Sequence, residues 1–177
     1  MTTERILSPA HSLFEASFSL LETAFPPEER RTRADHIRFL EKPDFHCCAL
    51  KNEDGFCGIL FYWEAETFIF LEHFAMLPHL RGQGLGAAAL SLLKSLGKPV
   101  ILEIEPPCDE MTQRRYGFYR RNGFLMNPFF HLQAKLRQAD EADVELKVLS
   151  FPQLLSQEAY DAFYAYMLQE IDIRNNQ

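Results

Sequence analysis

The sequence predicts an α/β protein with a mixed, mostly antiparallel sheet, one central parallel strand–helix–strand pair and helices on both faces. Strand-like runs follow one another directly in the first half of the chain, as in antiparallel hairpins. A glycine-rich turn then leads from a strand-like run into an Ala/Leu-rich helical run, and another apolar run follows, which is the order of a right-handed crossover. With 177 residues and 47% hydrophobic content, the chain can bury one substantial core.

Two helices are expected before the sheet. Apolar residues recur at helical spacing over residues 12–24, and Pro26 and Pro27 end that helix. A charged stretch at 28–33 leads into a second, short helix at 34–41.

Three strands follow, at 45–50, 56–63 and 68–76. The first two are separated by residues 52–55, Asn-Glu-Asp-Gly, which are typical of a hairpin turn. The third strand runs into Pro78 and the glycine-rich turn. We therefore expect an antiparallel arrangement that ends at the turn.

The crossover helix is expected at 87–96 and ends at Gly97, after which 100–105 is typical of a buried strand. A helix at 110–122 follows, with Gly123 as its C-terminal cap.

The last third of the chain carries weaker signals. Strands are expected near 129–136 and 144–149, joined by a polar connection at 138–143. An apolar stripe at helical spacing predicts a closing helix over 157–171.

The turn is the segment that indicates a ligand. It consists of Arg81, Gly82, Gln83, Gly84, Leu85 and Gly86. Glycine lets the backbone turn tightly and approach a ligand without a Cβ in the way. The first turn of the following helix offers unpaired N–H groups and the positive end of its dipole. We therefore expect a phosphorylated cofactor at this turn.

The spacing of the glycines is compatible with a dinucleotide site. Gly82-x-Gly84-x-x-Ala87 fits that fingerprint, and Glu105 lies roughly 20 residues on, where a ribose-binding acid is required. A doubly wound nucleotide domain normally starts with this unit, whereas roughly 65 residues precede it here. A P-loop is excluded because no Gly-Lys-Ser/Thr follows. A nucleotide-binding oxidoreductase stays as an alternative.

Two motifs taken together favour another family. Read as Arg81-x-x-Gly84-x-Gly86, the turn resembles the pyrophosphate-binding signature of the GNAT superfamily, the acyl-CoA-dependent N-acyltransferases. Downstream, residues 117–124, Gly-Phe-Tyr-Arg-Arg-Asn-Gly-Phe, resemble the Phe-Tyr-x-x-x-Gly-Phe that closes the superfamily's fourth helix. The resemblance covers residues 45–124, with the motifs in the right order and about the right distance apart.

The resemblance implies a single acyltransferase domain over residues 1–177, with acetyl-CoA as its cosubstrate. Residues 1–44 would form the acceptor-side helices, 45–124 the acyl-CoA-binding core, and 125–177 the C-terminal strands and helix.

The resemblance also implies contacts with CoA. The backbone of Phe74 and Met76 would bind pantetheine, and the turn, including Arg81, Gln83 and Leu85, would bind the pyrophosphate. One position departs from the family pattern. Thr112 stands where the superfamily commonly has a CoA-contacting asparagine.

The chemistry implied is attack of an amine on a thioester, for which a base must take a proton from the ammonium group. Strand alternation puts Glu72 on one face with Phe70 and Phe74, and burial there would raise its pKa. Glu72 is therefore the candidate general base, with a structural ion pair to the N-terminal helices as the alternative. Glu103 and Glu105 project together from the next strand and could orient a cationic acceptor, although Glu105 also suits the wet end of its strand.

The departing CoA thiolate benefits from an acid. The matched motif implies that the Tyr119 hydroxyl lies beside the CoA sulfur, and the alternative is plain core packing, as expected for Tyr116. His73, on the other face of its strand from Glu72, is expected to be a core histidine. Four arginines cluster on the helix of Tyr119, and contact with CoA phosphates is the alternative to the solvated face that a run of charges usually forms: Arg114, Arg115, Arg120 and Arg121.

These observations predict transfer of an acyl group, above all acetyl, from acyl-CoA to an amine of a small molecule or protein in a ternary complex. A noncatalytic acyl-CoA sensor is the second alternative. The net charge of −7 argues against a nucleic-acid partner, and no apolar run approaches the ~20 residues of a membrane span. Neither the four cysteines nor the six histidines form ligand pairs, so no metal is expected. We expect a cytoplasmic protein that can form a homodimer.

Overall fold

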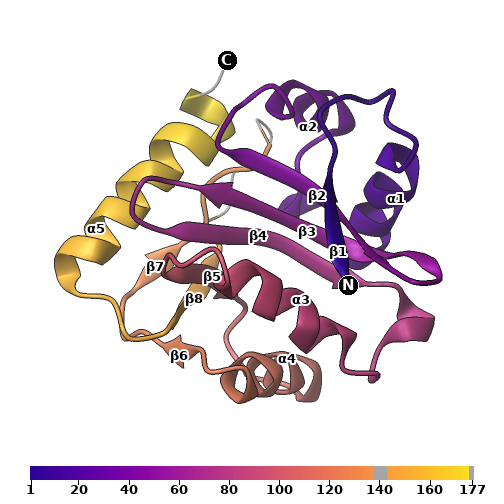
Figure 1. Cartoon of the computed structure of the whole chain (residues 1–177). Helices are drawn as coiled ribbons and strands as arrows, with labels where there is room; N and C mark the ends of the chain where they lie inside the picture. The colour runs from indigo at the N-terminus through magenta and orange to yellow at the C-terminus, as the bar shows by residue number, and fades with distance from the viewer. Residues whose placement is uncertain (138–142, 176–177) are drawn as a thin grey trace. The chain divides into compact units, whose positions relative to one another are not determined.

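The computed structural model describes residues 1–137 and 143–175, so the polar connection expected at 138–143 lies outside the described residues except for its last position. The chain divides into two compact units, Met1–Lys98 and Pro99–Gln177, and each is described by itself (Figure 1). The single domain expected from the sequence stays a prediction.

The first unit contains a four-stranded antiparallel sheet. Its strands are paired in chain order, β1 Thr2–Arg5, β2 Phe45–Asn52, β3 Gly55–Glu64 and β4 Ile69–Met76. In Figure 1, β2, β3 and β4 run side by side. The three strands predicted from the sequence are confirmed within one or two residues at each end.

Strand β1 was not predicted. Its four residues are polar or charged, so the segment has no apolar alternation of its own. It pairs with β2 from Thr2 opposite Lys51 to Arg5 opposite Cys48. The Arg5 guanidinium also donates to the carbonyl oxygens of Pro43 and Phe45, each at 2.7 Å. These tertiary contacts hold the strand in place.

The hairpin between β2 and β3 has the expected turn. Gly55 adopts a φ of 114°, in the region that favours glycine. The Asn52 side chain accepts a hydrogen bond from the backbone N–H of Asp54 at 3.0 Å. The turn chemistry read from the sequence is confirmed.

Three α-helices belong to this unit, and the predicted helices are all present: α1 Phe14–Ala24, α2 Arg33–Phe39 and α3 Leu85–Lys94. Helix α1 packs on β3 and β4, and α3 packs on β4. The Thr32 side chain caps α2 by accepting from the backbone N–H of Asp35. Two 3-10 turns, Pro27–Glu29 and Pro78–Leu80, connect these elements.

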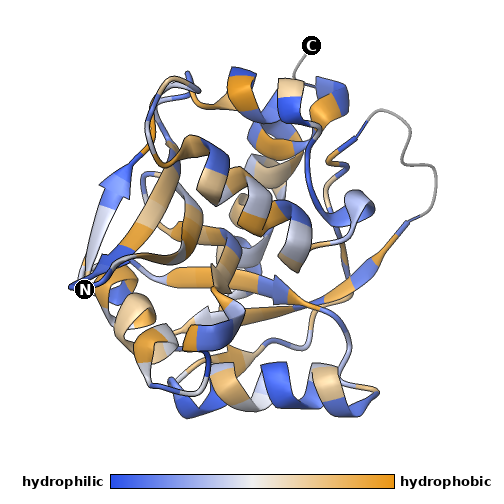
Figure 2. Ribbon diagram, turned by 90° about the vertical axis from the view of Figure 1, so that its right-hand side faces the viewer, coloured by the Kyte–Doolittle hydropathy of each residue, from blue (hydrophilic) through white to orange (hydrophobic). Residues whose placement is uncertain are grey.

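The core of the first unit is largely aromatic. Trp63, Phe61 and Phe45 are each at most 1% exposed. His36 is 2% exposed and makes ring contacts with Phe14, Phe18, Phe45 and Phe61. Figure 2 shows central strands that are mainly hydrophobic, a hydrophilic strand beside the N-terminus, and helices that carry both hydrophobic and hydrophilic residues.

The second unit is built around β8 Glu145–Phe151. This strand pairs antiparallel with β5 Val100–Ile104, β6 Leu125–Met126 and β7 His131–Leu132. The strand predicted at 129–136 is reduced to the two residues of β7, and β6 was not predicted. Two-residue strands carry no periodicity, so only their pairing with β8 identifies them.

The described residues of this unit form two α-helices, α4 Glu110–Arg121 and α5 Gln157–Tyr166. A capping box starts α4: Asp109 accepts from the backbone N–H of Thr112, whose hydroxyl accepts from the backbone N–H of Asp109. Gly123 follows α4 with a φ of 85°, so the predicted cap is confirmed. The closing helix expected over 157–171 is α-helical in α5 and continues as a π-helix, Met167–Ile171.

Candidate functional site

The glycine-rich turn lies where the sequence predicts it, between β4 and α3. Gly82 and Gly84 both have a φ of 79°, which L side chains rarely adopt. A Cβ built on either residue meets no atom within 4 Å, so the space in front of the turn is open. Residues 81–84 are exposed. The conformation therefore depends on glycine for its backbone angles, and the turn is accessible to a ligand.

The N-terminus of α3 opens onto this turn. Gly84 is the N-cap residue and has no side chain to bond the first N–H groups of the helix. Its carbonyl oxygen accepts from Ala88, which starts the helical hydrogen bonds. The Arg81 side chain donates to the Met76 carbonyl at 3.2 Å and Gln83 donates to the His79 carbonyl at 3.1 Å, so both side chains brace the turn. An anion would find backbone donors and a helix dipole here.

The backbone positions expected to bind pantetheine lie at the end of β4. Phe74 pairs with Leu60 and Met76 pairs with Gly58 of β3. Met76 is 7% exposed. The last residues of β4 therefore lie just before the turn, as the predicted order of elements requires.

Glu72 is buried and forms an ion pair with Arg31. The Glu72 carboxylate accepts two hydrogen bonds from the Arg31 guanidinium, at 2.8 and 2.7 Å. The exposed fractions of the two side chains are 4% and 0%. The Arg31 guanidinium also lies over the rings of Phe39, Phe45 and Trp63. This pair ties the segment between α1 and α2 to β4.

The raised pKa expected for Glu72 is wrong in direction. Burial alone would raise the pKa of the carboxyl, as the sequence argument supposed. The Arg31 charge and the neighbouring His73 outweigh burial and hold the pKa of Glu72 well below its ordinary value. The sequence argument named the desolvating phenylalanines but not the buried cation.

His73 lies on the same side of the sheet as Glu72, which corrects the alternation expected from the sequence. The register of β3 and β4 shifts between Phe61 and Tyr62, so Leu71 and His73 have partners on β3 and Glu72 does not. Such a bulge re-aims side chains. His73 Nδ1 lies 3.6 Å from the Glu72 carboxylate, and His73 Nε2 lies 2.8 Å from the Glu29 carbonyl oxygen. His73 is 3% exposed, as expected for a core histidine.

Tyr119 lies on α4 and is 8% exposed. Its ring contacts Phe118 and Phe124, with centroids 5.2 and 5.6 Å away. Burial raises the pKa of the phenol to about 12, so the group keeps its proton at neutral pH. Within residues 1–137 and 143–175 the Tyr119 hydroxyl makes no hydrogen bond to another side chain or backbone group, although a buried tyrosine usually finds a partner. It is available as a donor to a ligand.

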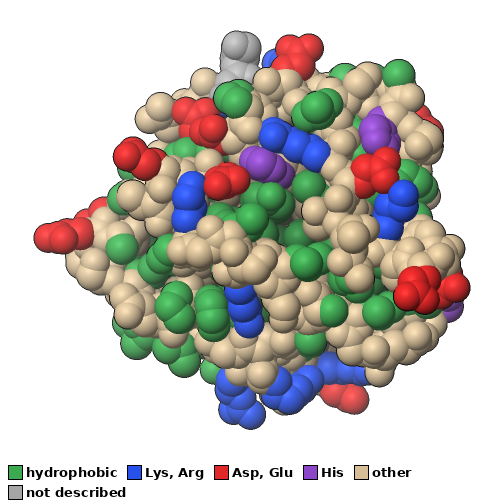
Figure 3. Space-filling view, viewed as in Figure 1, with side chains coloured by type: hydrophobic (Ala, Val, Ile, Leu, Met, Phe, Trp, Pro, Cys, Tyr) green, Lys and Arg blue, Asp and Glu red, His purple; other side chains and the backbone are tan. Residues whose placement is uncertain are grey.

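The arginines of α4 form the expected solvated face. Figure 3 shows basic side chains gathered along the edge where α4 lies. Arg115 forms an ion pair with Glu105, which is partly exposed beyond the end of β5. This contact fits the expectation that Glu105 occupies the wet end of its strand.

Two connected sets of side chains were missed by the sequence argument. Arg31 was part of a charged stretch and was not singled out, yet it is 1% exposed. His131 was not singled out, yet it is 1% exposed and contacts the carboxylate of Glu103. No short-range pattern marks either residue, because their partners are distant in sequence.

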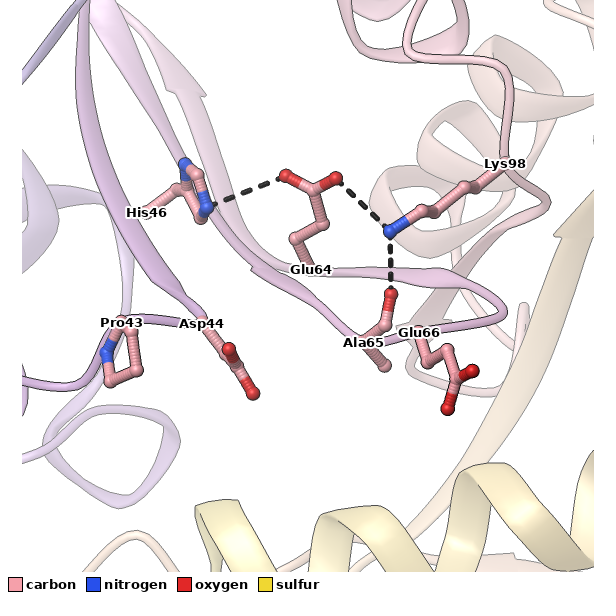
Figure 4. Close-up of a pocket in the computed structure, with 7 residues that line it drawn as sticks. All are labelled: Pro43, Asp44, His46, Glu64, Ala65, Glu66 and Lys98. Carbon is pink, nitrogen blue, oxygen red and sulfur yellow. Dashed lines mark hydrogen bonds and ion pairs between the residues drawn. The ribbon is translucent and has the colours of Figure 1, made fainter.

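A pocket of about 430 Å³ is lined by residues of which none was predicted to belong to the site: Pro43, Asp44, His46, Glu64, Ala65, Glu66 and Lys98 (Figure 4). Glu64 lies between His46 Nε2 at 3.5 Å and Lys98 Nζ at 3.1 Å, and Lys98 also donates to the Ala65 carbonyl at 2.8 Å. Because these groups satisfy one another, we assign the pocket no role.

No helix in the described part of the chain is long and apolar enough to cross a membrane. Across the same residues, no group of three or more His, Cys, Asp or Glu side chains is arranged to hold a metal ion.

Relatives of known sequence share part of this chain. YjbC of Bacillus subtilis (strain 168), for which acetyltransferase activity is a provisional assignment, is 34% identical over 111 residues. The match covers 60% of this chain and 55% of YjbC, so the chain spans about half the length of that relative.

Solved structures share the fold. A Bacteroides thetaiotaomicron protein, assigned provisionally to the GNAT acetyltransferases, superimposes with a TM-score of 0.89 at 26% identity, covering 97% of this chain and 98% of that one. An aminoglycoside 6'-N-acetyltransferase crystallised with coenzyme A gives a TM-score of 0.58 at 13% identity, over 85% and 96% of the two chains. The predicted fold class, a mixed α/β protein with mostly antiparallel strands, is confirmed.

The match to a family extends beyond the two motifs. The model of the acetyltransferase (GNAT) family matches residues 10–124, which include the N-terminal helices, the glycine-rich turn and α4. The chain therefore belongs to the GNAT family of acetyltransferases.

Proposed function

We propose that this protein transfers an acetyl group from acetyl-CoA to an amine of a small molecule or a protein, by direct attack in a ternary complex. The observation that carries the proposal is the open, exposed turn at the N-terminus of α3, where two glycines with positive φ leave backbone N–H groups free for an anion. Family membership supports the same reaction.

In this proposal the pyrophosphate of CoA binds the backbone of residues 82–86, and Arg81 braces the turn from behind. The backbone of Phe74 and Met76 binds pantetheine. Two structures that share the fold, the aminoglycoside acetyltransferase and a Bacillus subtilis acetyltransferase with a TM-score of 0.55 at 15% identity, contain CoA. No metal is required, because the thioester is already activated toward an amine.

Tyr119 is proposed as the acid that protonates the departing thiolate. Its hydroxyl keeps its proton at neutral pH and bonds to no described residue, as a donor reserved for a ligand would. The amine nitrogen bonds to the carbonyl carbon and gives up a proton to solvent, the C–S bond of the thioester breaks, the phenol supplies a proton to sulfur, and solvent returns a proton to the phenolate.

The general-base role predicted for Glu72 stays a prediction, and its ion pair weighs against it. A carboxylate whose pKa is held well below its ordinary value by a buried guanidinium has little tendency to take up a proton. The alternative kept from the sequence, a structural ion pair with the N-terminal segment, agrees with the bidentate contact to Arg31.

Titration calorimetry with CoA tests the cofactor site. In Gly84→Val the added side chain and the altered turn should abolish CoA binding. Gly97→Val is a matched control, because Gly97 has nearly the same φ, 81°, and equally open surroundings, but it follows the other end of α3. Both variants carry similar backbone strain, so only a site at the turn makes them differ.

Two results would overturn the assignment. Equal CoA affinity in folded Gly84→Val and Gly97→Val proteins would remove the turn from the site. Tight NAD binding by the wild type without CoA binding would favour the oxidoreductase. A thiol-release assay with acetyl-CoA and a panel of amines separates the enzyme from a noncatalytic acyl-CoA sensor, which would bind CoA without turnover. Cytoplasmic location and a homodimer stay predictions.

A further inference from the structure

Gly58 is buried in the interior of β3, where a glycine weakens a strand and often marks the close approach of another backbone. A Cβ built on Gly58 would lie 2.5 Å from the carbonyl oxygen of Ala75 on β4, closer than a side chain can come. At Gly117 and Gly123 the nearest atoms belong to side chains, at 3.2 and 3.3 Å. A backbone oxygen cannot swing aside as the end of a side chain can. A side chain at position 58 would therefore displace β4.

The peptide unit between Ala75 and Met76 is the part of β4 that closes on Gly58. Gly58 pairs with Met76 in the register of the two strands. The next residue of β4's exit, Leu77, donates its backbone N–H to the Cys57 carbonyl at 3.0 Å. Successive residues of a strand direct their N–H and C=O groups to opposite edges. The Met76 N–H therefore points away from β3, and the Ala75 carbonyl points toward it.

These two backbone groups move together. The peptide bond is planar, with its C=O and N–H antiparallel, so a shift of the Ala75 oxygen also turns the Met76 N–H. The Met76 side chain occupies the same place, because its Sδ atom lies 3.0 Å from the built Cβ and Leu50 Cδ1 lies 3.3 Å from it. The direction of the Met76 N–H therefore depends on the missing side chain at Gly58.

We propose that Gly58 is a positioning residue of the CoA site: it lets the Ala75 carbonyl close on β3 and so directs the Met76 N–H to the pantetheine arm. The proposal rests on the proposed binding of pantetheine by the backbone of Phe74 and Met76. An amide N–H must be well aligned with a carbonyl of that arm, because hydrogen bonds weaken steeply when they are bent. Gly58 itself touches no ligand and acts through the peptide unit of β4.

Titration calorimetry with two ligands tests the proposal. CoA carries the pantetheine arm, whereas 3′-phosphoadenosine 5′-diphosphate, the part of CoA that ends at the pyrophosphate, lacks it. In Gly58→Ala we expect the dissociation constant for CoA to rise about 10-fold, which corresponds to one misdirected hydrogen bond. The dissociation constant for the nucleotide should stay within about twofold of the wild type, because the pyrophosphate binds the glycine-rich turn and the N-terminus of α3.

Gly55→Ala is the matched control. It makes the same change in the same hairpin, and the φ of 114° at Gly55 disfavours a side chain, so this variant also loses stability. No atom lies within 4 Å of a Cβ built on Gly55, so β4 is not displaced. Both dissociation constants should equal those of the wild type. A role of Gly58 in stability alone predicts the same result for the folded Gly58→Ala protein.

The amide signal of Met76 in nuclear magnetic resonance spectra of the wild type is a second measurement, which does not depend on the folding of a variant. When CoA binds, this signal should shift and its hydrogen should exchange more slowly with solvent. With 3′-phosphoadenosine 5′-diphosphate the signal should stay as in the free protein. An equal response to the two ligands would overturn the proposal, because the Met76 N–H would then not distinguish the pantetheine arm.

The outcomes separate this inference from the proposed function. A folded Gly58→Ala protein that binds CoA as tightly as Gly55→Ala would overturn the positioning role and leave the CoA site standing. An equal loss for both ligands in Gly58→Ala would also overturn it, since the damage would then include the turn. A wild type that binds neither ligand would remove the proposed cofactor site, and this inference with it.

Discussion

Replacing Glu72 by glutamine separates its two candidate roles. The variant keeps the size of the side chain and one acceptor oxygen, but it loses the negative charge and one of the two hydrogen bonds to Arg31. The Arg31 side chain is 0% exposed, so its charge would stay buried without a counterion. Breaking a buried ion pair in this way costs about 3–5 kcal/mol.

The surroundings of Arg31 place the expected loss at the lower end of that range. The guanidinium carbon lies 4.2 Å from the centre of the Phe39 ring and 5.6 Å from that of Trp63. These cation–π contacts remain in the variant and stabilise the unpaired charge by about 1 kcal/mol. We expect a loss of about 3 kcal/mol in the free energy of unfolding at pH 7. For a chain of this size that lowers the melting temperature by about 6–12 °C.

Denaturation in urea, followed by tryptophan fluorescence, measures this loss. Trp63 is the single tryptophan of the chain and is 0% exposed, so its emission reports on the core beside Arg31. Glu15→Gln is the matched control, because Glu15 also bonds both nitrogens of an arginine, Arg33, but the two side chains are 71% and 45% exposed. An exposed pair contributes at most about 1 kcal/mol.

The pH dependence has a defined sign. Because the pKa of Glu72 is lowered in the folded state from 4.5, its contribution is complete above about pH 4.5 and declines as the pH falls toward the folded value. Glu72→Gln should remove that part of the acid sensitivity.

Equal stability losses in Glu72→Gln and Glu15→Gln would refute the buried-pair argument. A fall in kcat/KM of about 100-fold with loss of the acidic limb of the pH–rate profile would instead make Glu72 the base.

Two further predictions concern the leaving group and acid stability. Tyr119→Phe should bind CoA normally but lower kcat by about 10- to 1,000-fold, whereas Tyr116→Phe on the same helix should not. An unchanged kcat in Tyr119→Phe means that the thiolate leaves without this acid or that chemistry does not limit the rate. Burial, together with the Arg31 charge, lowers the pKa of His36 from 6.5 to about 3. The unfolded chain therefore takes up the proton at a higher pH than the folded protein, and the free energy of unfolding decreases as the pH is lowered from 6.5. The loss should reach about 2 kcal/mol at pH 5, and a His36→Gln protein that loses as much stability between pH 7 and pH 5 as the wild type would contradict this origin.

Local signals were sufficient for the glycine-rich turn, the hairpin and most helix ends. Gly84 and Gly123 have the positive φ that their places in the sequence require, and Gly55 closes the predicted hairpin. Each of these features is decided by residues within a few positions of one another, through turn geometry, capping and periodicity. The fold class and the order of the longer elements follow from the same signals, whereas β1 and β6 do not. Periodicity also located α1, and Ala/Leu-rich composition located α3; both helices pack on strands of the sheet.

Only the tertiary structure decided which charged groups meet. Glu72 and Arg31 are 41 positions apart, and Glu103 and His131 are 28 apart, so no local pattern could pair them. The bulge in β4 that turns Glu72 and His73 to the same side arises from pairing with β3. Burial, charge and hydrogen bonding act through space, and near a partner the direction of a pKa shift can reverse. The sequence therefore located the glycine-rich turn, whereas the lowered pKa of Glu72 was set by contacts between distant parts of the chain.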